Sequence, residues 1–234
     1  MPTQRVVLFD VDGTLLSNQV TEEGERNRYV EIIRDVVGKT PSVVPSRFAG
    51  MVDPQICKIL LTEVGLSNER VDYFLPKVLS RMAEIYPKVE KRLALNPGVT
   101  GLLGIIATSP THVTGVLTGN LTAVAEMKLT LTGIRPYFSE LFCADNYFDR
   151  NTLVENAVAN CLVKYDLSAR RDVVIVGDTP RDIESANKSH TTSVGVATGV
   201  YSLAQLREAE ATHVYHNLEP TKELLAGLGL RLVA

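Results

Sequence analysis

Three apolar runs that end in polar residues constrain the fold of this chain more than any other feature. They cover residues 5–11 (RVVLFDV), 113–118 (VTGVLT) and 172–177 (DVVIVG), and acidic or hydroxyl side chains stand at or just after each end. Short runs of this kind are typical of buried strands, and helical patterns separate most of them. Shorter strand-like pieces cover residues 141–143, 192–196 and 213–216. This alternation predicts an α/β fold, in which a parallel sheet has helices on both faces.

The interval between the first two runs is far longer than an ordinary crossover connection. Residues 21–95 within it show apolar residues at helical spacing, which indicates amphipathic helices. We therefore predict an α-helical cap domain at residues 18–94, inserted into an α/β catalytic core formed by residues 1–17 and 95–234. The two connections, near residues 15–20 and 92–97, would act as hinges of a lid.

Composition excludes several classes of partner. The formal net charge is −3 and no basic run occurs, so we expect no nucleic-acid partner. No stretch approaches the ~18 apolar residues of a membrane span, and the N-terminus does not resemble a secretory signal. The three cysteines are far apart in the sequence, which fits a reducing compartment. We expect a cytoplasmic protein without a membrane partner, either a monomer or a weak homodimer.

The strongest functional signal is the sequence DVDGT at residues 10–14. It places Asp10 and Asp12 at the end of a hydrophobic strand, and Gly13 allows a sharp turn there. Two carboxylates held so close repel each other unless a proton or cation intervenes, and Mg²⁺ prefers such oxygen ligands. One carboxylate can then act as a nucleophile while the other exchanges a proton with the leaving oxygen. Alternatively, the two acids only cap a turn.

A second signal is GDTPRD at residues 177–182, which follows another apolar strand. Asp178 stands at the strand tip, where it could complete a metal site. Asp182 is also the third residue of a helix that Thr179 caps, a position where an acid is favoured electrostatically. Asp182 is therefore either a metal ligand or part of a helix cap.

The third signal is LTGN at residues 117–120. The hydroxyl of Thr118 and the backbone amides near Gly119 and Asn120 precede a predicted helix, an arrangement that suits a phosphate group. Thr118 could instead simply cap that helix.

Together these motifs resemble the haloacid dehalogenase superfamily, in its phosphoglycolate-phosphatase-like branch. The resemblance rests on Asp10-Val11-Asp12-Gly13-Thr14, then Thr118, then Gly177-Asp178 with Asp182, in the order of the family. The helical insertion after the first motif and the stretch GVATGVYSLAQL at residues 195–206 also match. The resemblance covers nearly the whole chain and implies a Rossmann-like core.

The chain departs from the family at the expected lysine, where it has Asp149-Arg150-Asn151-Thr152. By position, Arg150 is the predicted cation for the nucleophile and a phosphate oxygen, although an arginine is not equivalent to a lysine. The plainer alternative is a solvated arginine beside a helix start. Lys128 is the second choice, because its place well along a helix predicts a solvent-facing side chain.

The resemblance implies a Mg²⁺-dependent phosphatase that acts through an aspartyl-phosphate intermediate. Asp10 would attack phosphorus, and Asp12 would serve as general acid and base. Mg²⁺ would be held by Asp10, the backbone carbonyl of Asp12 and Asp178. Thr118 and Arg150 would hold phosphate oxygens.

The substrate is expected to be a small phosphorylated metabolite, because a cap over the site would exclude a phosphoprotein. Arg47 precedes a cap helix and could reach a substrate carboxylate or hydroxyl, although the plainer alternative is an exposed loop arginine. A phosphomutase of the β-phosphoglucomutase type is the nearest alternative function. A non-catalytic phosphate-binding protein is a further alternative, against which the intact Asp10, Asp12 and Asp178 argue. A receiver-like signalling domain is another, against which the helical insertion and Asp12 argue.

Overall fold

Six strands form one parallel sheet in this computed structural model, which describes residues 4–17, 22–85 and 93–230. In chain order the strands are β1 (Arg5–Phe9), β2 (His112–Leu117), β3 (Glu140–Phe142), β4 (Val173–Gly177), β5 (Thr192–Val196) and β6 (His213–Tyr215). Their order across the sheet is β3-β2-β1-β4-β5-β6, and each neighbouring pair is parallel. This confirms the predicted α/β class. The order also places the carboxyl ends of β2, β1 and β4 side by side.

The strands are buried on both faces because their side chains alternate between two hydrophobic clusters. Val7 and Phe9 of β1 belong to a cluster with residues of α4, α5 and α9. Val6 and Leu8 belong to a second cluster with residues of α6 and α7. The helices of this part are α4 (Val99–Ala107), α5 (Thr122–Leu131), α6 (Arg150–Lys164), α7 (Pro180–Lys188), α8 (Leu203–Glu208) and α9 (Lys222–Gly227).

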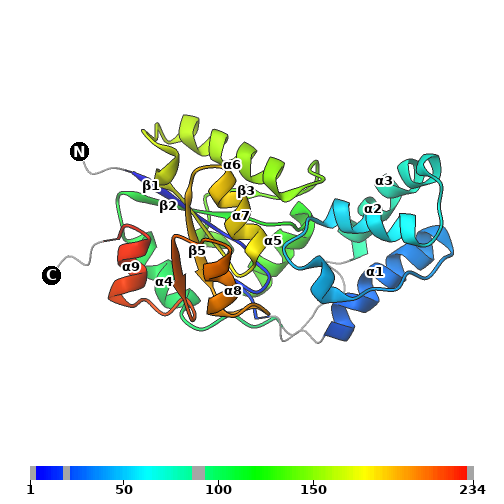
Figure 1. The fold of residues 1–234 in the computed structure, drawn as a ribbon, viewed down its shortest axis with the longest axis horizontal. Coiled ribbons are helices and arrows are strands. Elements are labelled where there is room, and N and C mark those ends of the chain that lie inside the picture. Colours follow the sequence, from blue (N-terminus) through cyan, green and yellow to red (C-terminus); the bar gives the residue numbers. More distant parts are fainter. Residues whose placement is uncertain (1–3, 18–21, 86–92, 231–234) are drawn as a thin grey trace.

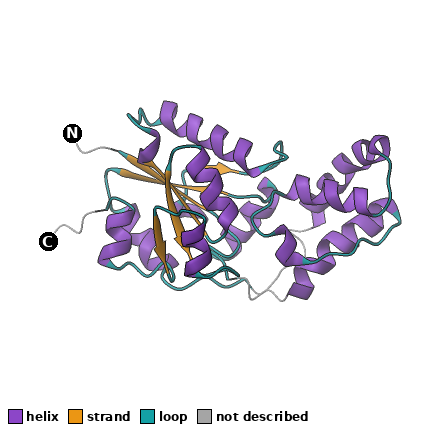
Figure 2. Ribbon diagram, viewed as in Figure 1, coloured by secondary structure: helices purple, strands orange, loops and turns teal. Residues whose placement is uncertain are grey.

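The long insertion after β1 is helical, as predicted. It contains α1 (Glu22–Val37), α2 (Asp53–Glu63) and α3 (Asn68–Ile85), which lie together to one side of the sheet (Figures 1 and 2). Their apolar stripes form a third cluster, which includes Ile33, Leu60 and Met82 and extends to Leu121, just before α5, and to Val124 of α5. The inserted helices therefore pack on one another and on the end of the sheet domain. The exact domain boundaries stay a prediction.

The insertion meets the strand ends through its segment 49–53. The backbone N–H of Asp53 donates to the carbonyl oxygen of Gly119 (2.8 Å), and the Arg181 guanidinium donates to the carbonyl oxygen of Ala49. A β-carbon at Gly119 would collide with the Met51 carbonyl, so the backbones approach closely only because this residue is glycine. None of the described helices is long and apolar enough to cross a membrane.

Candidate active site

Two acids of the site lie directly beyond neighbouring strands. Asp10 follows β1 and Asp178 follows β4, and the backbone N–H of Asp10 donates to the carbonyl oxygen of Val176 (2.9 Å). Because β1 and β4 are paired in the sheet, the two side chains emerge next to each other. Thr118 follows β2 on the other side of β1. The fold thus gathers one residue from each of the three sequence motifs at one edge, as open α/β sheets do with their ligand sites.

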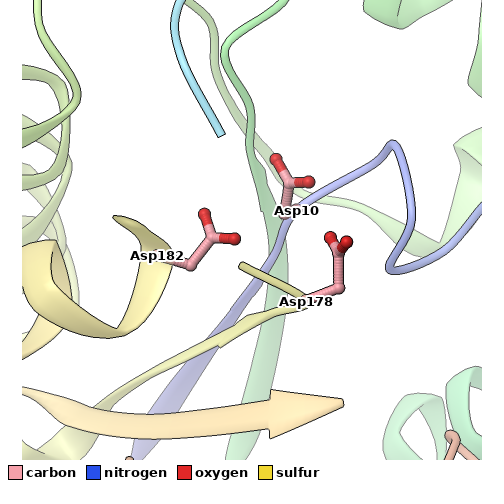
Figure 3. Close-up of side chains that lie close together, drawn as sticks. All are labelled: Asp10, Asp178 and Asp182. Atoms are coloured by element: carbon pink, nitrogen blue, oxygen red, sulfur yellow. The ribbon is translucent and has the colours of Figure 1, made fainter. Parts of the chain in front are cut away.

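Three buried carboxylates converge at this edge. Asp10, Asp178 and Asp182 each offer an oxygen within 4.8 Å of those of the other two, and the side chains point toward a common region (Figure 3). Burial, together with repulsion from Asp182 and Asp10, raises the pKa of Asp178 well above its usual range. Burial also raises the pKa of Asp10 to about 7, although the Arg150 charge opposes this shift. A divalent cation held by these oxygens would relieve both effects, so the residues fit a metal site.

The surroundings of Asp178 hold its carboxylate against the DVDGT turn. The Thr14 hydroxyl donates to Asp178 Oδ1 (3.1 Å). Gly13, at φ +85°, and Gly199 stand so close to this carboxylate that a β-carbon on either would collide with it. The absence of side chains at both positions therefore provides the space that this carboxylate occupies.

Asp182 serves the helix cap and an ion pair together. Its Oδ2 accepts hydrogen bonds from the backbone N–H (3.0 Å) and the hydroxyl (2.7 Å) of Thr179, which completes the predicted capping box of α7. Its Oδ1 lies 2.5 Å from Nη2 of Arg150, in an ion pair whose angle does not meet hydrogen-bond geometry. The capping interpretation therefore applies to one oxygen. The other faces the acidic cluster and its arginine.

Arg150, the first residue of α6, is buried among the acids and not solvated. Its Nη2 donates to Asp10 Oδ1 (3.2 Å) and to the carbonyl oxygen of Leu117 (3.3 Å). The pKa of Arg150 is raised, because the charges of Asp182 and Asp10 outweigh the opposing effect of burial. Its Nε has no hydrogen-bond partner among the described residues. A buried N–H group without an acceptor can donate a hydrogen bond to an oxygen of a bound anion.

Asp12 contacts a different cation from Asp10. Both of its carboxylate oxygens accept from Nζ of Lys128, each at 2.6 Å. The prediction that Lys128 faces solvent is wrong, because its side chain is 3% exposed. Lys128 falls on the buried face of α5 with Val124, Ala125 and Leu129, and a lysine on an apolar helical stripe is the signal that could have located it.

The LTGN residues are brought to the same edge but do different work. Thr118 is buried, and its hydroxyl oxygen accepts from the backbone N–H of Asn120 (3.3 Å). It does not cap α5, which begins at Thr122 after Leu121. Asn120 Oδ1 accepts from Lys128 (2.9 Å), so this side chain belongs to the surroundings of Asp12.

Arg47 lies on the inserted segment, where its side chain is 53% exposed and its Nη1 is 2.6 Å from Glu63 Oε1. The guanidinium also lies over the Phe48 ring, 5.2 Å from its centre. These contacts are with residues of the insertion and not with the acidic cluster. Its role in substrate binding stays a prediction.

A buried asparagine supports the DVDGT turn and was not predicted from the sequence. Nδ2 of Asn96 donates to the carbonyl oxygens of Gly13 (2.9 Å), Thr14 (2.9 Å) and Leu16 (3.2 Å). Asn96 therefore ties the chain that returns from the insertion to the turn that leads into it. An asparagine before a proline carries no sequence signal for such a contact.

A buried acidic centre at the carboxyl edge of a parallel sheet, next to inserted helices, defines this chain as an α/β protein with a helical insertion beside an acidic site. More specifically, the chain belongs to the haloacid dehalogenase-like hydrolases, whose family model matches residues 7–196. This confirms the resemblance that the motifs indicated. The family includes phosphatases and phosphomutases, and no curated protein matches the chain.

Solved structures with the same fold are distant in sequence. They include a predicted phosphoglycolate phosphatase from Haemophilus somnus (18% identity, TM-score 0.70, covering 94% of this chain and 96% of that one). CbbY from Rhodobacter sphaeroides, solved in complex with phosphate, has 17% identity and a TM-score of 0.71 over 97% of this chain and 100% of that one. A candidate β-phosphoglucomutase from Thermotoga maritima has 20% identity and a TM-score of 0.59 over 97% and 99%.

Proposed function

We propose that this chain is a Mg²⁺-dependent phosphatase that hydrolyses phosphate monoesters of small metabolites through a phosphorylated aspartate. The observation that carries this proposal is the buried Asp10 carboxylate, which Arg150 contacts and Asp178 adjoins. A carboxylate placed beside a fixed cation and an acidic cluster can attack a phosphorus atom whose charge that cation and a metal neutralise. Positioning and charge neutralisation supply most of the catalysis in phosphoryl transfer.

The reaction divides into two steps. In the first, an Asp10 oxygen forms a bond to phosphorus, the bond to the ester oxygen breaks, and Asp12 gives its proton to the departing alcohol. In the second, water attacks phosphorus as Asp12 accepts its proton, and the bond to Asp10 breaks to release phosphate. Thr118 and Arg150 hold phosphate oxygens in both steps, with Gly119 beside them. Asp12, 32% exposed in its side chain, is open to such exchange.

Mg²⁺ would be held by carboxylate oxygens of Asp10 and Asp178 and by the backbone carbonyl of Asp12. When bound, it supplies positive charge to the phosphate oxygens and lets the neighbouring acids remain ionised. Asp182 adjoins this site, but its oxygens already contact Thr179 and Arg150. We therefore assign Asp182 chiefly to orienting Arg150.

The inserted helices support a small substrate. Their segment 49–53 contacts the loop after β2 and the start of α7, because Asp53 meets Gly119 and Ala49 meets Arg181. Because this segment covers the strand ends, we expect a small metabolite as the substrate and not a folded phosphoprotein.

Phosphate release from a panel of small phosphate esters, with and without Mg²⁺, tests the proposed function. We expect metal-dependent turnover in the parent protein and a loss of about 10³-fold or more in Asp10→Asn, because the amide is a poor nucleophile. Asp72→Asn, the same change at an exposed acid of α3, should leave turnover unchanged. Equal activity in Asp10→Asn and the parent would contradict the mechanism. Isomerised product without free phosphate would favour a phosphomutase, and binding without turnover a phosphate-binding protein.

A further inference from the structure

Lys128 has surroundings that its position in the sequence does not explain. Its amine lies within 2.6 Å of both Asp12 oxygens and 2.9 Å from Oδ1 of Asn120. Burying an ammonium group costs several kcal/mol unless charged or polar partners compensate. Ala125 and Leu129 flank Lys128 on the same buried face of α5. An apolar side chain would fill that place without this cost, so the amine needs another explanation.

The exposures of the two partners show how Lys128 could act. The side chain of Lys128 is 3% exposed, whereas that of Asp12 is 32% exposed. Lys128 therefore lies behind the carboxylate, and the carboxylate is the group that a substrate can reach. A group in this position acts through Asp12 and not by its own contact with substrate.

Each acid of the DVDGT motif consequently has its own buried cation. Arg150 contacts Asp10, and Lys128 contacts Asp12. The two cations come from different helices, α6 and α5. Two separate counter-charges can fix the two carboxylates in different orientations, which two groups with different tasks require.

We propose that Lys128 is a positioning residue for the reaction, which holds the Asp12 carboxylate in the orientation needed for proton exchange with the leaving alcohol. The inference rests on the proposed function, because it gives Asp12 that exchange. Asn120 supports the same orientation by fixing the amine of Lys128. General acid–base catalysis depends closely on such geometry, since small displacements of the catalytic group lower the rate steeply.

The test compares esters that differ in their need for a proton. p-Nitrophenolate is a weak base and leaves without a proton, whereas the alkoxide from benzyl phosphate is a strong base that needs one. kcat/KM covers only the steps up to loss of the alcohol. We expect Lys128→Met to lower kcat/KM on benzyl phosphate roughly tenfold or more beyond its effect on p-nitrophenyl phosphate, as expected for impaired acid catalysis. Lys164→Met, the same change at an exposed lysine, should alter neither value.

A structural role for Lys128 predicts an equal loss on both esters, and that result would overturn the proposal. So would an unchanged ratio in a folded variant. Failure of the proposed function is distinguishable, because the parent would then lack Mg²⁺-dependent turnover or Asp10→Asn would retain it.

If the Lys128→Met variant does not fold, a double variant provides a second test. Asp12→Asn/Lys128→Met removes both charges, so no uncompensated charge stays buried. If Lys128 acts through Asp12, this double variant should match Asp12→Asn on benzyl phosphate within about threefold, as a double-mutant cycle requires. A further tenfold loss in the double variant would contradict the inference.

Discussion

At the scale of single residues, the buried arginine at the start of α6 contacts two acids of the site. Arg150 is the cation that contacts Asp10 and lies 2.5 Å from Asp182. Without Arg150, Asp10 and Asp182 would lose the cation that compensates their buried negative charge. All three of its contacts, to Asp10, Asp182 and the Leu117 carbonyl, come from Nη2, and its Nε has no hydrogen-bond partner among the described residues.

We expect Arg150→Met to lower the free energy of unfolding by about 3 kcal/mol in metal-free buffer at pH 8, because it leaves buried carboxylates without their counter-charge. Urea denaturation measures this change. Arg135→Met removes a partly exposed ion pair with Glu126 and should cost about 1 kcal/mol or less. Equal losses in the two variants would contradict the central place of Arg150. Turnover should also fall strongly in Arg150→Met.

The acids of the site could be located from the sequence, because the carboxyl ends of parallel strands lie at the same edge of a sheet. Asp10, Asp178 and Thr118 follow buried runs, so their shared edge could be predicted. Lys128 cannot be placed in this way, because it lies within a helix and not at a strand end. Asn96 acts through a contact between residues far apart in the chain, which no local pattern reports.

At the scale of elements, α2 joins the insertion to the site through a buried acid at its first position. The backbone N–H of Leu121 donates to Oδ2 of Asp53 (3.0 Å), and the Tyr29 hydroxyl donates to its Oδ1 (2.7 Å). Burial raises the pKa of Asp53 to about 6, although these hydrogen bonds and the charge of Lys128 oppose the shift. One carboxylate thus connects α1, α2 and the start of α5.

The raised pKa of Asp53 gives a signed prediction for stability. Between its ordinary pKa near 4 and about 6, the folded chain holds a proton that the unfolded chain releases. This acid therefore costs stability as pH rises through that window, by about 3 kcal/mol in all, and the cost is fully present above pH 6. Asp53→Asn stays neutral and should lack the cost.

Urea unfolding of the parent and of Asp53→Asn from pH 4 to pH 7 measures this effect as a difference. The other acids titrate in both proteins and cancel. We expect the parent to lose stability relative to Asp53→Asn over the window. A difference that stays constant with pH, or that grows in the parent's favour, would contradict the assignment.

At the scale of the whole molecule, we expect the proposed metal site to link stability to a bound cation. A ligand that binds only the folded state adds about 2.7 kcal/mol at a hundred times its Kd. For a chain of this length we expect Mg²⁺ to raise Tm by about 5–10 °C, as measured by calorimetry. In Asp178→Asn the increase should largely disappear, whereas Asp72→Asn should keep it. An equal increase in all three proteins would indicate that the cation binds elsewhere.

The α/β class and the helical insertion followed from the sequence, because periodicity reports them directly. The order of the strands across the sheet was not predicted, because parallel strands of similar composition give no sequence signal for which of them are neighbours. The contact between the insertion and the strand ends also escaped prediction, because it depends on main-chain atoms at Gly119 and Asp53.

That contact bears on how such proteins diversify. The backbone of Gly119 lies against the Met51 carbonyl, and its carbonyl oxygen accepts from the backbone N–H of Asp53. This part of the contact between the insertion and the sheet domain therefore uses main-chain atoms and does not depend on most side chains. Exchanging the residues that face a metabolite would then leave the contact between residues 49–53 and the sheet domain intact. Chimaeras that graft helices from a relative, while retaining residues 49–53, should transfer preference without rebuilding the reactive centre.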